Sequence, residues 1–187
     1  MSDTAMDLIG SGMVALSRDT LAALRNALMR DLGYAAAGYL QESGYAGGGG
    51  QFEAFRAWLE VRGLGNVESL SIGAFQAQAS EFFRDCGWGS LTVGHLHDSV
   101  ATLDSEDWAE ATPHVGLDHP GCHLSSGLFA DFFGRVADAP LAVMEVECRS
   151  AGSSRCRFLL GSSDVLQHVY DGMAAGVPYE EAVGTAA

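Results

Sequence analysis

Three of the four cysteines lie between Gly121 and Phe158, in a stretch that also places a glutamate among apolar residues. Cys148 and Cys156 flank a hairpin-like turn, and a turn centred midway between them sets them opposite each other, with Cβ atoms about 4.5 to 5.5 Å apart. Two thiolates so placed can share a tetrahedral zinc at about 2.3 Å. Cys122 can supply a third ligand. Glu145 is the natural fourth, because a buried carboxylate needs a partner or a metal.

Strict strand alternation works against this ligand set at one point. Glu145 and Cys148 lie three positions apart, so a regular strand directs them to opposite faces. A shared metal therefore requires a β-bulge, or the end of the strand, between Val146 and Cys148.

Other assignments of these residues remain open on the sequence alone. Cys148 and Cys156 could form a cross-strand disulfide, or all the thiols could be buried without a metal. His119 and His123 flank the first cysteine and could replace Glu145 as a ligand, since histidine is a common zinc ligand.

The composition limits what such a centre serves. A chain of 187 residues is long enough for one domain with a core, and 24 acidic against 10 basic residues give a formal charge of -14. This charge disfavours binding to nucleic acid or to an anionic membrane. No run of apolar residues is long enough to insert in a membrane, and no cleavage signal is visible at the N-terminus. We therefore expect a cytoplasmic protein with reduced thiols.

The first half of the chain is predicted to be helical. The first dozen residues lack periodicity and are expected to form a loose arm or a short strand. Apolar spacing predicts helices at residues 18–32, 34–43, about 52–62 and about 71–86, and the glycines at residues 47–50 are interpreted as a flexible connector. The run lacks the strand and the Lys-Ser/Thr of a phosphate-binding loop.

The second half alternates between strand and helix patterns. Strands are predicted at residues 91–96, 100–103, 141–148 and 155–160, with a loop at 104–120 and helices at 122–137 and from 162 or 163 to about 176. The fold class is therefore α+β, with helices packed on an antiparallel sheet of about four strands.

The cysteine-rich stretch resembles a known family. The segments CHLSSGL from Cys122, MEVEC up to Cys148 and GSSRCRF around Cys156 resemble the 4-vinyl reductase domain, found in a bacteriochlorophyll-biosynthesis protein and in sensors of aromatic-responsive activators. In that family Cys, Glu, Cys and Cys hold a zinc at gaps of 23, 3 and 8 positions, and Cys122, Glu145, Cys148 and Cys156 have the same gaps.

The resemblance, which is firm over about residues 91–161, implies a fold shared with Golgi-tethering and nitric-oxide-signalling proteins. It implies an apolar ligand cavity, a homodimer formed through the helical half, and ligand contacts from Ser126, Phe132 and Val143. The resulting organisation is one domain, residues 1–187, with a helical half at 18–87, the 4-vinyl reductase core and zinc site at 88–162, and a C-terminal helix and tail at 163–187.

Three hypotheses for function follow. The first is a stand-alone sensor or carrier with a structural zinc and a pocket for an aromatic, hydrocarbon or tetrapyrrole-like ligand. The second is a reductase, or an accessory factor, in (bacterio)chlorophyll vinyl reduction, although no dinucleotide-binding motif is visible. The third is an interaction module that binds a lipid or an acyl chain.

Four further residues have weaker signals. His95 and His97 end a predicted strand and could form a second metal pair, but a surface or cavity-edge position is favoured because no third ligand is near. Cys86 is interpreted as a buried thiol with no obvious partner. Trp108 lies in an aperiodic segment and is expected either to close a pocket or to cover the sheet.

Overall fold

The computed structural model describes residues 12–186 and has the predicted α+β fold, with six α-helices and four antiparallel strands in the described part of the chain. The expected arm of the first dozen residues falls almost entirely outside this part. The elements in chain order are α1 (Arg18–Leu32), α2 (Ala35–Val61), the 3₁₀ turn η1 (Val67–Ser69), α3 (Ile72–Asp85), β1 (Thr92–His97), β2 (Val100–Ser105), α4 (His123–Ala137), β3 (Ala142–Glu147), the 3₁₀ turn η2 (Arg149–Ala151), β4 (Cys156–Gly161), α5 (Ser163–Ala174) and α6 (Tyr179–Thr185).

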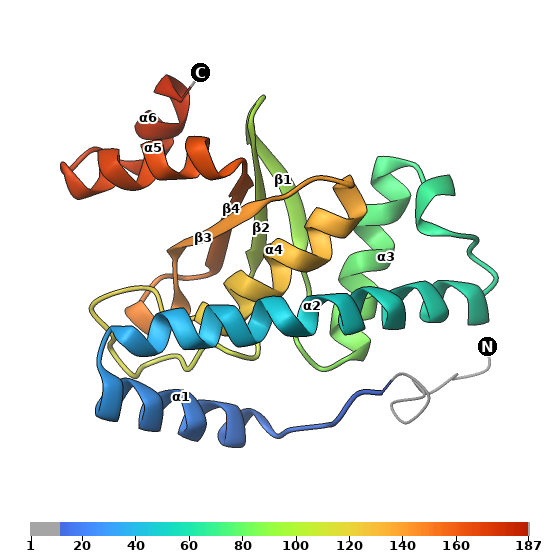
Figure 1. Cartoon of the computed structure of the whole chain (residues 1–187), viewed down its shortest axis with the longest axis horizontal. Helices are drawn as coiled ribbons and strands as arrows, with labels where there is room; N and C mark the ends of the chain where they lie inside the picture. Colours follow the sequence, from blue (N-terminus) through green and yellow to red (C-terminus); the bar gives the residue numbers. More distant parts are fainter. Residues whose placement is uncertain (1–11, 187) are drawn as a thin grey trace.

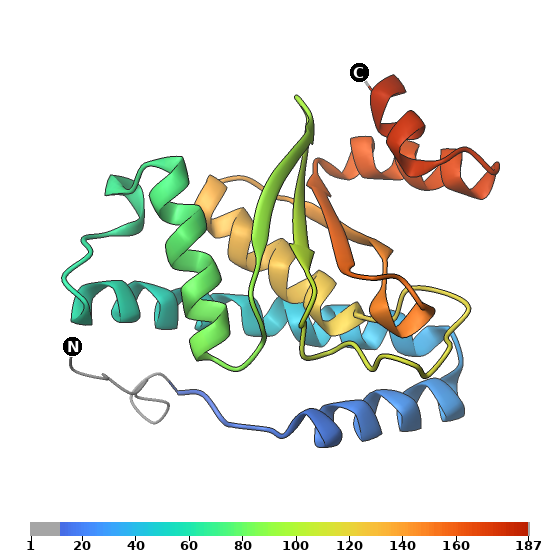
Figure 2. The same ribbon diagram turned by 180° about the vertical axis from the view of Figure 1, so that it is seen from behind.

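The sheet has the strand order β1-β2-β4-β3, and all neighbours are antiparallel. Figures 1 and 2 show α4 lying across one face of the sheet and α2 packed on the far side of α4. Helix α1 follows α2 further out, and α5 and α6 lie together at one end of the sheet. The layers therefore enclose α4 between α2 and the sheet.

The interior between these layers is filled by aromatic rings. Phe55, Phe83, Phe132 and Trp108 are fully buried, and Phe132 packs against Phe55 and Phe83 with ring centroids 5.6 and 5.1 Å apart. Edge-to-face and tilted contacts of this kind stabilise a core beyond simple area burial. The centre of the molecule is thus a packed aromatic core.

Most predicted element boundaries are confirmed. Helix α1 begins after Ser17, whose hydroxyl accepts a hydrogen bond from the backbone N–H of Thr20 at 3.1 Å. Serine caps of the same kind precede α3 and α5 at Ser71 and Ser162. Local capping chemistry therefore determines where these helices start.

The flexible connector predicted at residues 47–50 is wrong, because α2 continues through it without a break. Gly44 and Gly48 face α4 at very short range. A Cβ at Gly44 would lie 1.9 Å from the backbone oxygen of Leu124, and one at Gly48 would lie 2.6 Å from Cβ of Asp131. Glycine costs a helix about 1 kcal/mol relative to alanine. Here, the close packing of two helix backbones offsets that cost.

Candidate functional site

The four predicted metal ligands come together at one end of α4. Cys122 is the residue that caps the N-terminus of α4, Glu145 lies in β3, Cys148 directly follows β3, and Cys156 begins β4. One ligand atom from each lies within 4.8 Å of all the others, and all four residues are buried. Among the described residues, no other such group of three or more is found.

The predicted irregularity in β3 is present and brings Glu145 to the side of the cysteines. The pairing register of β3 with β4 shifts between Glu145, opposite Phe158, and Glu147, opposite Arg157. The extra residue, Val146, makes a β-bulge, and the strand ends one residue later. Two residues that regular alternation separates therefore share one face.

The spacing of the thiols suits a tetrahedral metal. Sγ of Cys122 lies 3.9 Å from Sγ of Cys148 and 3.9 Å from Sγ of Cys156. A tetrahedral zinc with bonds of about 2.3 Å separates its sulfur ligands by about 3.8 Å. Cys148 and Cys156 are not joined in a disulfide. The distances match a shared cation and exclude a sulfur–sulfur bond of about 2.05 Å.

Glu145 has one carboxylate oxygen available to a cation. Its Oε2 accepts a hydrogen bond from the backbone N–H of Cys122 at 2.7 Å, whereas Oε1 is buried and has no hydrogen-bond partner. A buried oxygen without a partner costs free energy unless a ligand or ion satisfies it. The Cys₃Glu donor set therefore fits a metal ion.

The charges in this cluster are strongly shifted. Burial raises the pKa of Cys122 and of Glu145 well above their ordinary values. Hydrogen bonds from the thiols of Cys122 and Cys156 lower the pKa of Cys148, so Cys148 is the first thiolate of the group. Several buried anions repel each other, and a divalent cation removes that repulsion.

The two histidines considered as replacement ligands stay outside the four-residue group. His119 and His123 stack with ring centroids 6.3 Å apart, and Nδ1 of His119 contacts the carboxylate of Asp118. Burial lowers the pKa of His123 and keeps it neutral. His95 and His97 belong to no group of three potential ligands among the described residues either, as expected.

A buried carboxylate that the sequence interpretation missed fixes the first turn of α4. Glu110 accepts hydrogen bonds from the backbone N–H groups of Leu124 at 3.0 Å and Ser125 at 2.7 Å, and from the hydroxyl of Ser125. Burial raises the pKa of Glu110 to about 7. Since Cys122 caps the same helix, Glu110 helps to position the cysteine. No periodic pattern marks it, because its partners are far along the chain.

A second missed residue connects α1 to this region. Arg25, only 2% exposed, donates to the backbone oxygen of Glu110 at 2.6 Å and to the hydroxyl of Thr112 at 2.8 Å. A charged residue on an amphipathic helix is normally placed in solvent, so no sequence pattern selects it. It attaches the outermost helix to the segment that carries Glu110.

Two minor interpretations are revised. Trp108 is fully buried, donates from Nε1 to the hydroxyl of Ser125 at 2.7 Å and stacks on Trp88, so it belongs to the core and is no lid. Cys86 is partly buried and has a partner, because Nε2 of Gln51 donates to its sulfur at 3.5 Å. Burial raises the pKa of Cys86 to about 12.

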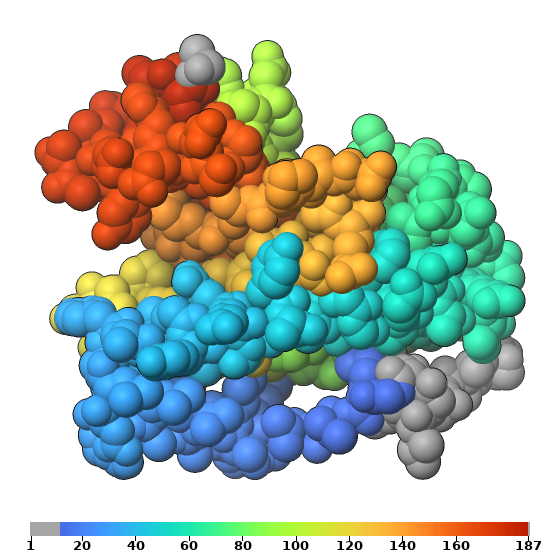
Figure 3. Space-filling view, in the orientation of Figure 1, coloured from blue at the N-terminus to red at the C-terminus, as the bar shows by residue number. Residues whose placement is uncertain are grey.

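The three predicted pocket residues lie in two different environments. Ser126 and Val143 line a shallow groove of about 280 Å³ where α2, α4 and β3 meet, whose other lining residues are Gln41, Glu42, Tyr45, Gly127 and Ala130. Figure 3 shows α4 and β3 reaching the surface between α2 and the C-terminal helices. Phe132 does not line this groove and is part of the aromatic core.

The fold and the Cys₃Glu centre define the class of module, an α+β domain whose strands and central helix converge on one buried metal-type site. Residues 105–162, which contain all four ligands, match the family model of the 4-vinyl reductase domain. This match confirms the family resemblance that the sequence predicted for the cysteine-rich stretch. No curated protein matches the sequence significantly.

Solved structures share this fold at low sequence identity. The phenol-responsive sensory domain of the transcription activator PoxR, solved with phenol, has a TM-score of 0.61 and 19% identity, covering 87% of this chain and 81% of that one. Trafficking protein particle complex subunit 3 from Naegleria fowleri, covalently bound to palmitic acid, has a TM-score of 0.54 and 13% identity, covering 77% and 91%. These likenesses confirm the predicted fold.

A third structure is more distant. A vinyl-4-reductase family protein from Methanocaldococcus jannaschii has a TM-score of 0.40 and 19% identity, covering 47% of this chain and 57% of that one. A separate property concerns membranes. Within residues 12–186, none of the helices combines the length and the hydropathy needed to cross a bilayer.

Proposed function

We propose that this chain is a small-molecule-binding module of the 4-vinyl reductase domain type, a sensor or carrier, in which a zinc ion has a structural role. The observation that carries the proposal is the buried Cys₃Glu cluster, whose ligand atoms lie within 4.8 Å of one another inside the segment that matches the family model. Four protein ligands complete a tetrahedral shell. They leave no open position of the kind that a catalytic zinc needs for water or substrate.

The chemistry of the donors favours zinc. Thiolate ligands select soft or borderline metals, and a tetrahedral site built mainly from sulfur is typical of zinc. Bound zinc would neutralise Cys148 and Glu145 and would fix the junction of α4 with β3 and β4. We further infer a reducing, cytoplasmic location, because the buried thiols remain unbridged and must stay reduced to bind metal.

The ligand is proposed to be apolar or aromatic and to contact Ser126 and Val143 in the groove between α2, α4 and β3. Phe132 is proposed to contact it from the inner side of α4, which requires the aromatic side chains of the core to move. The proposal is supported by the fold shared with a sensory domain solved with phenol and a trafficking subunit bound to palmitic acid. Phenol and palmitate are therefore the first probes.

Native mass spectrometry of the freshly purified chain tests both parts together. We expect one zinc per chain and, on incubation, binding of one of the two probes. Val143→Trp should fill the groove and reduce probe binding at least tenfold, while Val177→Trp, on the exposed loop after α5, should leave it unchanged. A chain that binds zinc but neither probe would retain the metal proposal and refute the ligand proposal.

We also propose that residues 1–187 form one domain and that it dimerises through its helical half. The N-terminal part of α2 and the residue before it carry exposed aromatic side chains, namely Tyr34, Tyr39 and Tyr45. Exposed aromatic residues are typical of protein interfaces. The mass of the native particle decides the oligomeric state in the same experiment.

A further inference from the structure

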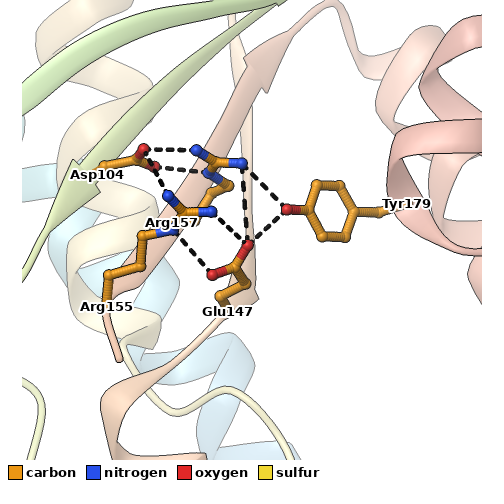
Figure 4. A network of polar contacts seen from close by, with 5 residues as sticks. All are labelled: Asp104, Glu147, Arg155, Arg157 and Tyr179. Atoms are coloured by element: carbon orange, nitrogen blue, oxygen red, sulfur yellow. Dashed lines mark hydrogen bonds and ion pairs between the residues drawn. The ribbon is translucent and has the colours of Figure 1, made fainter. Parts of the chain in front are cut away.

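A network of charged and phenolic groups connects α6 to the sheet on the face opposite the metal centre (Figure 4). Arg157 donates to both carboxylate oxygens of Asp104, at 2.7 and 2.6 Å, and Arg155 donates to both oxygens of Glu147, at 2.9 and 3.0 Å. Tyr179 joins the two pairs. Its hydroxyl donates to Glu147 at 2.5 Å and accepts from Arg157 at 3.1 Å.

The same two strands carry this network and the metal ligands. In β4, Cys156 lies between Arg155 and Arg157, so alternation directs its thiol to one face and the two guanidinium groups to the other. In β3, Glu145 contacts Cys122 on the α4 side, while Glu147 belongs to the network. The two sites therefore lie back to back across the hairpin.

The β-bulge at Val146 is the element that both sites share. A regular strand would direct Glu145 and Glu147 to the same face, and the extra residue at Val146 separates them. A one-residue change of register moves side chains from one face of a sheet to the other. Neither glutamate can therefore change its position without altering the backbone that holds the other.

Tyr179 is the residue through which α6 reaches the network. It is the first residue of α6, and the rest of that helix packs through Ala182 and Val183 against a small apolar cluster that includes Val100. The apolar contacts are limited, because α6 has only seven residues. The polar contacts of Tyr179 thus form a substantial part of the attachment of α6 to the sheet.

We propose that Glu147 and Tyr179 are positioning residues of the metal centre, so that metal occupancy and the docking of α6 are coupled through the bulge at Val146. The inference rests on the proposed metal site. A cation bound by Glu145 and Cys148 holds the bulged register, and the contacts of Glu147 with Tyr179 hold it from the other face. By linkage, each of the two events strengthens the other by the same factor.

The first test measures zinc affinity by competition with a chromophoric chelator. Tyr179→Phe removes two hydrogen bonds on the face of the sheet opposite the ligands, and it should weaken zinc binding about fivefold. Tyr170→Phe, at an exposed tyrosine of α5, is the matched control and should leave the affinity unchanged. Equal affinities in the wild type and Tyr179→Phe would overturn the coupling, although zinc still binds. A wild type that takes up no zinc would refute the metal centre itself.

The second test measures hydrogen exchange of the α6 amides with and without zinc. In the wild type, removal of zinc should accelerate exchange in α6 at least fivefold relative to α2. In Tyr179→Phe, α6 should exchange rapidly in both states, so the effect of zinc on α6 should disappear. A role of Tyr179 that is only structural would raise exchange equally and keep the zinc effect, which contradicts the proposal. If zinc removal unfolds the whole chain, the affinity comparison decides alone.

Discussion

Gly127 of α4 faces the backbone oxygen of Gln41 in α2 so closely that a Cβ atom on Gly127 would lie 1.9 Å from that oxygen. Gly44 of α2 makes the reciprocal approach to Leu124 of α4. The two helices thus touch through their backbones at the end of α4 that carries Cys122. The distance between α2 and α4 is fixed by the absence of side chains, and the metal centre depends on it.

Replacing Gly127 with alanine should therefore destabilise the protein. The added methyl group cannot be accommodated by a side-chain rotation, because the obstacle is backbone, and we expect a loss of about 3 kcal/mol or more. Gly38→Ala is the control, since nothing lies within 4 Å of a Cβ there, and it should be neutral or stabilising by up to about 1 kcal/mol. Urea denaturation monitored by circular dichroism measures both, and equal stabilities would contradict the helix contact.

The buried carboxylate of Glu110 should make stability depend on pH. Burial raises its pKa in the folded state to about 7, from an ordinary value of 4.5. The folded protein therefore binds the additional proton between these values, and the free energy of unfolding falls as the pH rises from about 4.5 to about 7. Glu110→Gln should lack this effect, so the stability of the wild type relative to this variant should decrease over that window, by on the order of 2 to 3 kcal/mol.

The comparison between the two proteins cancels any loss of metal that both suffer at low pH. Glu106→Gln, at an exposed glutamate of the same segment, controls for the loss of one negative charge. Thermal unfolding across the pH range provides the measurement. A constant difference between the wild type and Glu110→Gln would show that Glu110 stays ionised in the folded protein.

Loss of one metal ligand should lower both zinc content and thermal stability. Cys156→Ser removes a buried ligand, and because zinc joins α4 to both strands, we expect a melting temperature lower by on the order of 10 °C. A chelator should lower the wild type by a similar amount and leave Cys156→Ser unaffected. Cys86→Ser, outside the ligand group, should retain one zinc per chain. Zinc loss from the wild type without any change in melting temperature would contradict the structural role.

The parts of the fold that the sequence predicts well depend on local chemistry. Apolar spacing and the cap Ser17 predict a helix at residues 18–32, and α1 has those bounds, because both signals act within a few residues. Spacing and the family resemblance predict the four metal ligands. The structure groups all four, including Glu145, which needs the predicted bulge.

The failures have a common physical origin in long-range packing. Glycines at residues 47–50 normally interrupt a helix, and only the contact of α2 with α4 explains why they do not. Glu110 and Arg25 lie 85 positions apart, so no window of sequence can show their contact. The family resemblance assigns Phe132 to a pocket, and it lies in the packed core, because the number of neighbouring rings is a property of the assembled layers.

Replacing Arg25 with lysine should loosen α1 without removing the metal. The guanidinium group makes two buried hydrogen bonds in different directions, to the backbone oxygen of Glu110 and to Thr112. A lysine ammonium can reach at most one of them, so we expect a loss of about 1 to 3 kcal/mol. Arg30→Lys is the control, because Arg30 is exposed and bonds only to the neighbouring Asp31 among the described contacts.

Hydrogen exchange resolves where that stability is lost. Exchange should accelerate in α1 and in residues 108–112, because Arg25 holds the backbone of this segment, while zinc content should remain at one per chain. The carboxylate of Glu110 still binds the first turn of α4 in the variant, so Cys122 keeps its place. Equal exchange in Arg25→Lys and Arg30→Lys would show that α1 is held by its apolar contacts alone. Loss of zinc from Arg25→Lys would instead show that α1 supports the metal centre directly.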